Sequence, residues 1–347
     1  MEVNQEKREE WVDCVKVVAC VLVVLGHFFQ SMTKAGIIAE GTLWKWFDQM
    51  IYCFHVQLFF ICSGYLYQRK NQIHRIDAWR RRILEKAVVL GIPYAVFSVI
   101  TWGMKKVFSL DVNSGEAGLL RVLFVAPLSP YWYLYTLFLC FAVTPAIKRG
   151  STIVFMPVIA LVSKLFVVSG AATGIGVPYV LRNLLGNEIW FVAGMLLEVF
   201  SFKKIISHRR CIVAGGLGGT AFLLIGFAVF QTGGIGRWEQ FFLGILACSS
   251  ILMTAAGFCK KNGQESIWEI GRKYIFPIFL MHTIFAAGVR ILLLKIGIDH
   301  AGVHVAAGVM ISFLGPVAVM KVTERWMRFL VYPEIPGICL KKQEAGN

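Results

Sequence analysis

The chain has 347 residues, of which 57% are hydrophobic and 16% are charged, and its formal net charge is +15. A soluble globular domain is about half apolar and about a quarter charged, so this composition excludes an ordinary soluble enzyme. An excess of Lys and Arg is typical of the cytoplasmic loops of membrane proteins. We therefore expect these basic residues to reflect insertion in a lipid bilayer, and we expect no nucleic-acid partner.

The apolar residues are gathered in blocks of about 20, the length that crosses a hydrocarbon core about 30 Å thick. Length and hydropathy together predict an all-α, polytopic membrane bundle of about ten transmembrane helices. The expected spans lie near residues 12–32, 46–68, 84–104, 130–147, 152–169, 188–202, 211–231, 238–258, 274–296 and 303–322. The Gly-rich stretch before the sixth span is expected to be either a plain loop or irregular backbone that lines a cavity.

The basic residues orient this bundle. The loops after the second, fourth, sixth and eighth spans carry most of the Lys and Arg, which predicts that both termini are cytoplasmic. We expect a cytoplasmic N-terminal tail at 1–11, one membrane domain at 12–332 and a cytoplasmic C-terminal tail at 333–347. The first block has no small-residue cleavage site after it, and we interpret it as a signal anchor in the inner membrane.

The nine cysteines include no CxxC pair and lie mostly in apolar blocks, which argues against a disulfide framework and against a zinc site.

Three ionisable residues, Asp13, Lys16 and His27, mark the first span. Such groups are costly inside a membrane and are by default functional. Asp13 and Lys16 are spaced for an ion pair, and Lys16 and His27, eleven residues apart, share one helix face over about 16 Å. The alternatives are that Asp13 and Lys16 are interfacial, with Lys16 reaching toward water, and that His27 makes a packing hydrogen bond.

Several segments resemble a known family. The first span, from Asp13 and Lys16 to the run LVVLGH that ends at His27, resembles the opening of the acyltransferase-3 family of membrane acyltransferases. The segments FHVQLFFICSGYLYQRK, WRRRILEKAVVLGIPYAVFS, PYWYLYTLFLCFAVTP, IWFVAGMLLE and IFPIFLMHTIF resemble later parts of that family, in the same order.

The chain departs from the family pattern at three places. Many members have Arg at the position of Lys16, and Lys cannot make the bidentate contacts of Arg. Gln57 stands in place of a Pro, and Gln72 interrupts an Arg-x-x-Arg pattern that would begin at Arg69.

The resemblance implies acyl transfer from acetyl-CoA or a related acyl-CoA, with His27 as the key catalytic residue and Asp13 and Lys16 as its partners in the motif. A neutral imidazole can act as a general base on an acceptor hydroxyl, or can itself be acylated and relay the group. The sequence leaves both routes open.

Cationic side chains near the second and third spans are candidates for binding the donor. Arg80, Arg81, Arg82 and Lys86 are expected to hold the phosphates of coenzyme A, or else to contact lipid headgroups. Ser63 and Gly64 allow close approach of a ligand or of another helix.

Four further residues are candidate acceptor contacts. His55 and His282 lie within the membrane by counting, where a packing hydrogen bond is the alternative role. Trp132 and Tyr133 are expected near the outer face, where an interfacial aromatic belt explains them equally well. The pattern of the histidines matches no metal-binding motif, so no metal is expected.

These features predict an inner-membrane O-acyltransferase that modifies a hydroxyl of a cell-envelope glycan. The partners would be the acyl-CoA donor, the glycan acceptor and the bilayer, and the oligomeric state stays open. A transporter or exporter of a glycan unit is the main alternative, although no inverted repeat supports it. A membrane sensor or scaffold is the third.

Overall fold

The computed structural model of the protein describes residues 9–70, 76–108, 118–148, 150–202, 208–259, 267–323 and 328–333. These residues form helices and connecting loops, without a strand. Among them, eight helical stretches are long and apolar enough to cross a membrane, one of which, 42–70, consists of two successive helices, and two shorter apolar helices span 132–143 and 152–168. The all-α membrane bundle is thus confirmed, whereas the expected ten spans correspond to eight long helical stretches and two short helices. Most of the predicted tails, 1–11 and 333–347, lies outside the described residues.

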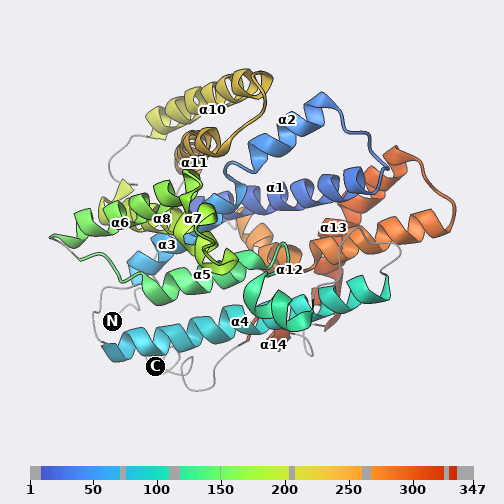
Figure 1. The fold of residues 1–347 in the computed structure, drawn as a ribbon, viewed down its shortest axis with the longest axis horizontal. Helices are drawn as coiled ribbons and strands as arrows, with labels where there is room; N and C mark the ends of the chain where they lie inside the picture. Colours follow the sequence, from blue (N-terminus) through green and yellow to red (C-terminus); the bar gives the residue numbers. More distant parts are fainter. Residues whose placement is uncertain are drawn as a thin grey trace.

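The helices follow one another in the order shown in Figure 1. The first part of the chain forms α1 (Glu10–Lys34), α2 (Thr42–Ile51), α3 (His55–Lys70) and α4 (Ile76–Val107). The middle part forms the short π-helix η1 (Arg121–Val125), α5 (Trp132–Val143), α6 (Thr152–Val168), α7 (Ala171–Gly174) and α8 (Tyr179–Val199). The last part forms α10 (His208–Gln231), α11 (Arg237–Phe258), α12 (Ile267–Lys295), α13 (Ala301–Thr323) and α14 (Arg328–Val331).

The first helix lies at the centre of the bundle. α1 packs against α3, α11, α12 and α13, and Figure 1 shows it between α2 and α11 on one side and α12 and α5 on the other. Its buried side chains recur along most of its length, from Trp11 through Val15, Ala19 and Val23 to Phe28. A helix that is buried on several sides needs apolar residues around its circumference. Asp13, Lys16 and His27 of α1 are half-buried in this bundle, whereas Lys34 at the end of the helix is exposed.

The predicted second span is broken into two helices. The amides of Cys53 and Phe54 bond the carbonyls three residues back, at 3.2 Å each, and the regular helical pattern resumes in α3. Bonds of this type tighten the backbone and end the first helical segment at Ile51. The break brings Tyr52 and His55 to the same place in the bundle.

Helix α8 begins earlier than expected. The Gly-rich stretch was expected to be a loop or irregular backbone up to residue 187, but only the part before Pro178 is a connection, with α7 inside it. Pro178 precedes the first helical residue, Tyr179, and extended backbone there starts the helix. The longer α8 carries Glu188 near its middle.

Helices α3 and α8 approach each other at two glycines. A Cβ atom at Gly64 would overlap the carbonyl oxygen of Phe191, and one at Gly194 would overlap the carbonyl oxygen of Ile61. Small residues allow this close approach in membranes, where packing and not the hydrophobic effect drives helix association. Close helix packing therefore accounts for Gly64.

Candidate active site

Three helical segments and one loop converge on His27. Nδ1 of His27 lies 3.5 Å from the hydroxyl of Tyr52, which follows α2, and Nε2 lies 3.5 Å from the hydroxyl of Ser129, which precedes α5. The ring of His282 on α12 is 5.5 Å away between centroids, at an interplanar angle of 32°. His27 itself is half-buried. Hydrogen bonds as long as 3.5 Å are weak, so both ring nitrogens can be taken over by a substrate.

The second histidine has a defined tautomer. Nδ1 of His282 lies 3.0 Å from the carbonyl oxygen of Ile278 and 2.9 Å from that of Phe279. A carbonyl only accepts, so Nδ1 carries the proton, and Nε2 of the neutral ring is an acceptor. That Nε2 is buried and has no hydrogen-bond partner in the part of the chain that the structure describes. A bare acceptor beside His27 is suited to a polar hydrogen of a substrate.

The third histidine, His55, is separated from His27 by the ring of Tyr52. His55 stacks edge-on against Tyr52 with centroids 4.6 Å apart, and its Nδ1 donates to the carbonyl oxygen of Ile51 at 2.6 Å. Its connection to His27 therefore runs through the Tyr52 ring. Of the predicted site residues, the structure brings His27, His55 and His282 together.

Ser129 reaches His27 because the loop before α5 is fixed from both sides. The buried hydroxyl of Tyr131 donates to the carbonyl oxygen of Leu280 on α12 at 2.9 Å and lies 2.9 Å from Thr101 Oγ1 on α4. Irregular backbone at membrane depth is tolerated where it is buried in protein or lines a cavity. The loop thus completes the wall of the site opposite Tyr52.

An aromatic column leads from this site along α5. Tyr133 packs against Phe59 and Phe60 of α3 at 5.6 and 5.0 Å and against Phe279 of α12 at 5.5 Å, and the ring of Phe279 lies 6.4 Å from His282. The predicted acceptor contact Tyr133 is therefore a core residue, while its neighbour Trp132 is half-buried.

The same column reaches Ser63, which was predicted to bind the acyl-CoA donor. Ser63 lies close enough to the Tyr133 hydroxyl to interact with it, so Ser63 faces the column. Gly64, by contrast, faces α8.

The other end of α5 lies beside a group of cations. Lys86 Nζ is 5.1 Å from the centroid of Phe141, and the guanidinium of Arg82 is 6.0 Å from that of Tyr67. The charges of Glu85, Lys70, Lys16 and Arg82 all act on Lys86, that of the Glu85 carboxylate most strongly. We call Lys16, Lys70, Arg82 and Lys86 the cationic cluster.

The predicted donor residues on α4 therefore fall into two pairs. Arg82 and Lys86 are half-buried and face the bundle, whereas Arg80 and Arg81 are exposed. The structure brings only Arg82 and Lys86 to the aromatic column.

Asp13 and Lys16 lie at the cluster end of α1. Both are half-buried, and both act electrostatically on Cys62 of α3. Counted by residues along the helix, Lys16 is about 16 Å from His27 and Asp13 is about 21 Å from it. The structure thus separates the predicted catalytic residues into His27 at the histidine site and Asp13 with Lys16 at the cationic cluster.

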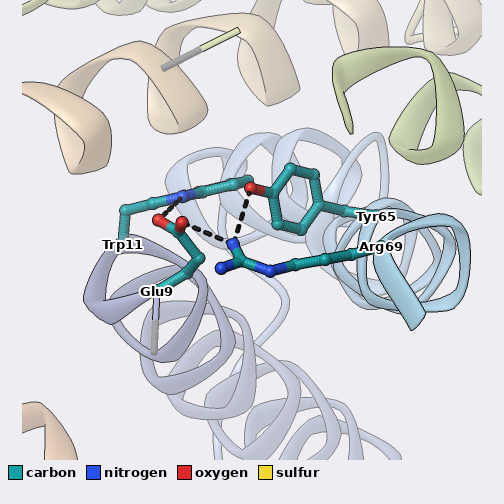
Figure 2. Close-up of polar contacts among 4 residues, drawn as sticks. All are labelled: Glu9, Trp11, Tyr65 and Arg69. Carbon is teal, nitrogen blue, oxygen red and sulfur yellow. Dashed lines mark hydrogen bonds and ion pairs between the residues drawn. The ribbon is translucent and has the colours of Figure 1, made fainter. Parts of the chain in front are cut away.

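A polar network fastens the start of α1 to the end of α3 (Figure 2). The carboxylate of Glu9 accepts from Arg69 at 2.5 Å and from the indole N–H of Trp11 at 3.1 Å, and Arg69 also donates to the Tyr65 hydroxyl at 3.4 Å. The Trp11 and Tyr65 rings meet edge to face at 4.8 Å. The network fixes the position of the helix that carries both Lys16 and His27.

A buried carboxyl was missed at the sequence level. Glu188 on α8 accepts a hydrogen bond from Thr144 Oγ1 at 3.1 Å, and the Thr144 carbonyl accepts one from Tyr67 at 2.9 Å. The hydropathy pattern placed Glu188 at the edge of a short span, where a carboxylate is unremarkable. Only the longer α8 shows that it lies inside the membrane domain.

Tyr52 and Ser129 were also missed. Tyr52 stands three residues before His55, a spacing that places two side chains on one helix face. No local pattern marks Ser129, which meets His27 across 102 residues of chain. Among the described residues, no three His, Cys, Asp or Glu side chains are grouped so that they can hold a metal ion.

Comparison with known proteins assigns the chain to a family. The family model described as an acyltransferase domain matches residues 9–321. The nodulation protein NolL of Mesorhizobium japonicum is 28% identical over 132 residues, which is 37% of this chain and 33% of that protein. The match thus spans about a third of the relative's length, and no solved structure matches the chain significantly. Because the family model covers the chain from the start of α1 to the end of α13, this protein belongs to the acyltransferase-3 family of membrane acyltransferases.

Proposed function

We propose that this protein is an integral-membrane O-acyltransferase that moves an acetyl or similar acyl group from cytoplasmic acyl-CoA to a hydroxyl of a cell-envelope glycan. The proposal places it in the inner membrane with the start of α1 on the cytoplasmic side. The arrangement around His27 carries the proposal: an imidazole held by two weak hydrogen bonds, beside the unpartnered acceptor Nε2 of His282.

Two routes fit this arrangement. In the direct route, His27 takes the proton of the acceptor hydroxyl while its oxygen attacks the thioester carbonyl; the C–S bond breaks, and His27 returns the proton to the thiolate of coenzyme A. In the relay route, a His27 nitrogen attacks the carbonyl, the C–S bond breaks, and the leaving thiolate of coenzyme A takes the proton of the acylated ring. The acceptor oxygen then takes the acyl group from the imidazole, and the proton of its hydroxyl returns to the ring. Both routes begin with a neutral ring.

The donor would bind between the cationic cluster and the histidines. Arg82, Lys86 and Lys16 supply positive charge for the phosphates of coenzyme A, because ammonium and guanidinium groups bind phosphate by charge-assisted hydrogen bonds. The buried face of α5 from Phe141 to Tyr133 spans eight residues, about 12 Å, and offers an apolar wall for the pantetheine arm. The thioester would then arrive next to His282 and His27.

Labelled acetyl-CoA supplied to inverted inner-membrane vesicles tests this function. Vesicles with the wild-type protein are expected to transfer label into an envelope glycan fraction as an alkali-labile ester, and vesicles with His27→Ala are expected not to. If both preparations leave the glycan unlabelled and the wild type instead moves a glycan unit across the membrane, the transporter function is the correct one.

A further inference from the structure

Ser129 and His27 form a hydroxyl–imidazole pair. Ser129 Oγ lies 3.5 Å from Nε2 of His27, and the Tyr52 hydroxyl lies 3.5 Å from Nδ1 on the other side of the ring. A serine beside a histidine whose second nitrogen is held by a third group has the arrangement of an activated nucleophile. The hydrogen bonds of such sites are often long before a substrate binds, so 3.5 Å is compatible with this role.

The protonation that this pair requires fits the groups around the ring. Nε2 of His27 must be bare to accept the proton of Ser129, so Nδ1 carries the ring proton and donates it to the Tyr52 oxygen. The Tyr52 ring is itself held, because it packs edge-on against His55 at 4.6 Å, and His55 Nδ1 donates to the carbonyl oxygen of Ile51. His27 thus presents an acceptor nitrogen to Ser129.

Helix capping does not explain Ser129. A serine just before a helix commonly accepts a hydrogen bond from an amide of the first turn. The N-cap residue of α5 is Tyr131, and no side-chain capping bond is made there. Within the described residues, the hydrogen bond with His27 is the one that Ser129 Oγ makes. The Ser129 hydroxyl is therefore available for chemistry.

The loop before α5 holds Ser129 in place and leaves it accessible. The amide of Trp132 donates to the carbonyl oxygen of Leu128 at 3.0 Å, which closes the backbone around Ser129. The buried Tyr131 fixes this turn to α12 by donating to the Leu280 carbonyl at 2.9 Å. Ser129 itself is exposed. A nucleophile has to be positioned and reachable at the same time, and this loop meets both conditions.

Ser129 also lies where the two substrates would meet. The apolar wall proposed for the pantetheine arm follows α5 from Phe141 to Tyr133, and Ser129 lies just before that helix. Phe141, at the other end of α5, is the residue beside the cation Lys86. In the orientation proposed above, the thioester therefore arrives at Ser129 from the cytoplasmic side, and an envelope hydroxyl reaches the exposed serine from the outer side.

We infer that Ser129 is the nucleophile that carries the acyl group from the donor to the acceptor, with His27 as its base. This inference rests on the proposed function, and it puts a serine oxygen in the place of the ring nitrogen of the relay route. Direct transfer and an acylated His27 are the alternatives.

The two steps balance without a further reactant. In the first, Ser129 Oγ attacks the thioester carbonyl and its proton passes to His27 Nε2; the C–S bond breaks, and His27 gives that proton to the thiolate of coenzyme A. In the second, the acceptor hydroxyl gives its proton to His27, and its oxygen attacks the serine ester. The C–O bond to Ser129 breaks, and Ser129 Oγ recovers the proton from His27.

Exchange of coenzyme A in the absence of any acceptor tests for the covalent step. Purified protein in nanodiscs is mixed with acetyl-CoA and labelled free coenzyme A, and the entry of label into acetyl-CoA is measured. Because the serine ester forms reversibly, the wild type is expected to catalyse this exchange, and Ser129→Ala is expected to be at least about 100-fold slower. Ser169→Ala, at an exposed serine after α6, is the matched control and should exchange as the wild type does.

The residue that carries the acyl group is identified separately. Acetyl-CoA labelled in its acetyl group is added without acceptor, the reaction is stopped with acid, and the labelled peptide is identified by mass spectrometry. An ester at Ser129 survives acid, whereas an acetylated His27 ring hydrolyses. Label is expected on the peptide that contains Ser129 in the wild type, and on no peptide in Ser129→Ala.

The outcomes separate this inference from the proposed function. Wild-type exchange in Ser129→Ala with an unchanged melting temperature, or an acetyl group found on another residue, would overturn the role of Ser129. A wild type that acetylates the glycan but shows no exchange would overturn it as well, since that is the direct route. A wild type that neither exchanges coenzyme A nor transfers acetyl groups would overturn the proposed function together with the inference.

Discussion

Around His27, each neighbouring side chain offers a different interaction. Tyr52 and Ser129 have hydroxyls that either donate or accept, so they can follow the ring as it gains and loses a proton. His282 is fixed as an acceptor at Nε2 by its bonds to backbone carbonyls. This combination suits a base that must exchange a proton without a permanent charged partner, because a buried ion pair would hold the proton in one place.

The role of His282 can be separated from its packing. Asn at position 282 can still donate to the carbonyl oxygens of Ile278 and Phe279 but lacks the acceptor that Nε2 provides. We expect His282→Asn to keep its melting temperature within a few degrees and to lose about 100-fold in kcat, a typical loss for a group that handles a proton. His300→Asn, at an exposed histidine before α13, serves as the control. Wild-type kcat in His282→Asn would show that the backbone bonds alone explain this histidine.

At the level of helices, two contacts set the geometry of the site: the crossing of α3 with α8 and the network at the start of α1. Both act on helices that carry site residues, and neither includes an atom of the histidine site. Their loss should therefore change stability and alignment before it changes the chemical step.

The α3–α8 crossing predicts a contrast between two helical glycines. Gly64→Ala places a methyl group against the Phe191 carbonyl and should destabilise the protein by about 1–3 kcal/mol, the usual cost of overpacking. Gly91→Ala on α4 meets no atom within 4 Å and should be neutral or slightly stabilising. Thermal unfolding in detergent measures both. Equal melting temperatures for the two variants would contradict the close crossing.

The network in Figure 2 predicts a change in donor affinity. Glu9→Gln removes the charge that accepts from Arg69 and should cost about 1–2 kcal/mol of stability. Because α1 also carries Lys16, we expect KM for acetyl-CoA to rise more than kcat falls. Steady-state kinetics with varied acetyl-CoA measure this split. A fall in kcat alone, with KM unchanged, would mean that the network does not position the donor end of α1.

Sequence patterns predicted some of these helices correctly and the ends of others wrongly. The spans of α1, α11 and α13 follow from long apolar runs, which local hydropathy detects. The break between Ile51 and His55 and the early start of α8 at Tyr179 depend on tertiary contacts and on a single Pro, which a hydropathy window averages out. Likewise, the sequence marks His27 as an ionisable group inside an apolar helix. Ser129 lies near His27 because Tyr131 holds its loop through contacts with distant helices, and no pattern in the neighbouring sequence indicates those contacts.

At the scale of the whole molecule, α1 carries basic residues near both of its ends. The cationic cluster lies at its start, His27 lies about 25 Å along it, and Lys34 is its last residue. In the proposed orientation, donor and acceptor approach His27 from opposite faces of the membrane, and the acyl group alone crosses between them.

The position of the cationic cluster predicts which basic side chains affect the binding of acetyl-CoA. Arg82→Gln/Lys86→Gln should raise KM for acetyl-CoA about tenfold or more through loss of phosphate contacts, with little change in KM for S-acetylpantetheine, which lacks the phosphates. Arg80→Gln/Arg81→Gln, at the exposed neighbours, should leave both values unchanged. The same increase in KM for both donors would mean that Arg82 and Lys86 do not bind phosphate.

The most direct measurement is release of free coenzyme A from acetyl-CoA by the purified protein in nanodiscs with envelope glycan as acceptor, compared between the wild type and His27→Gln. The wild type should release coenzyme A continuously, and His27→Gln, folded to the same melting temperature, should be at least about 100-fold slower. Equal rates in the two proteins, or no release by the wild type with any envelope acceptor, would contradict acyl transfer at His27.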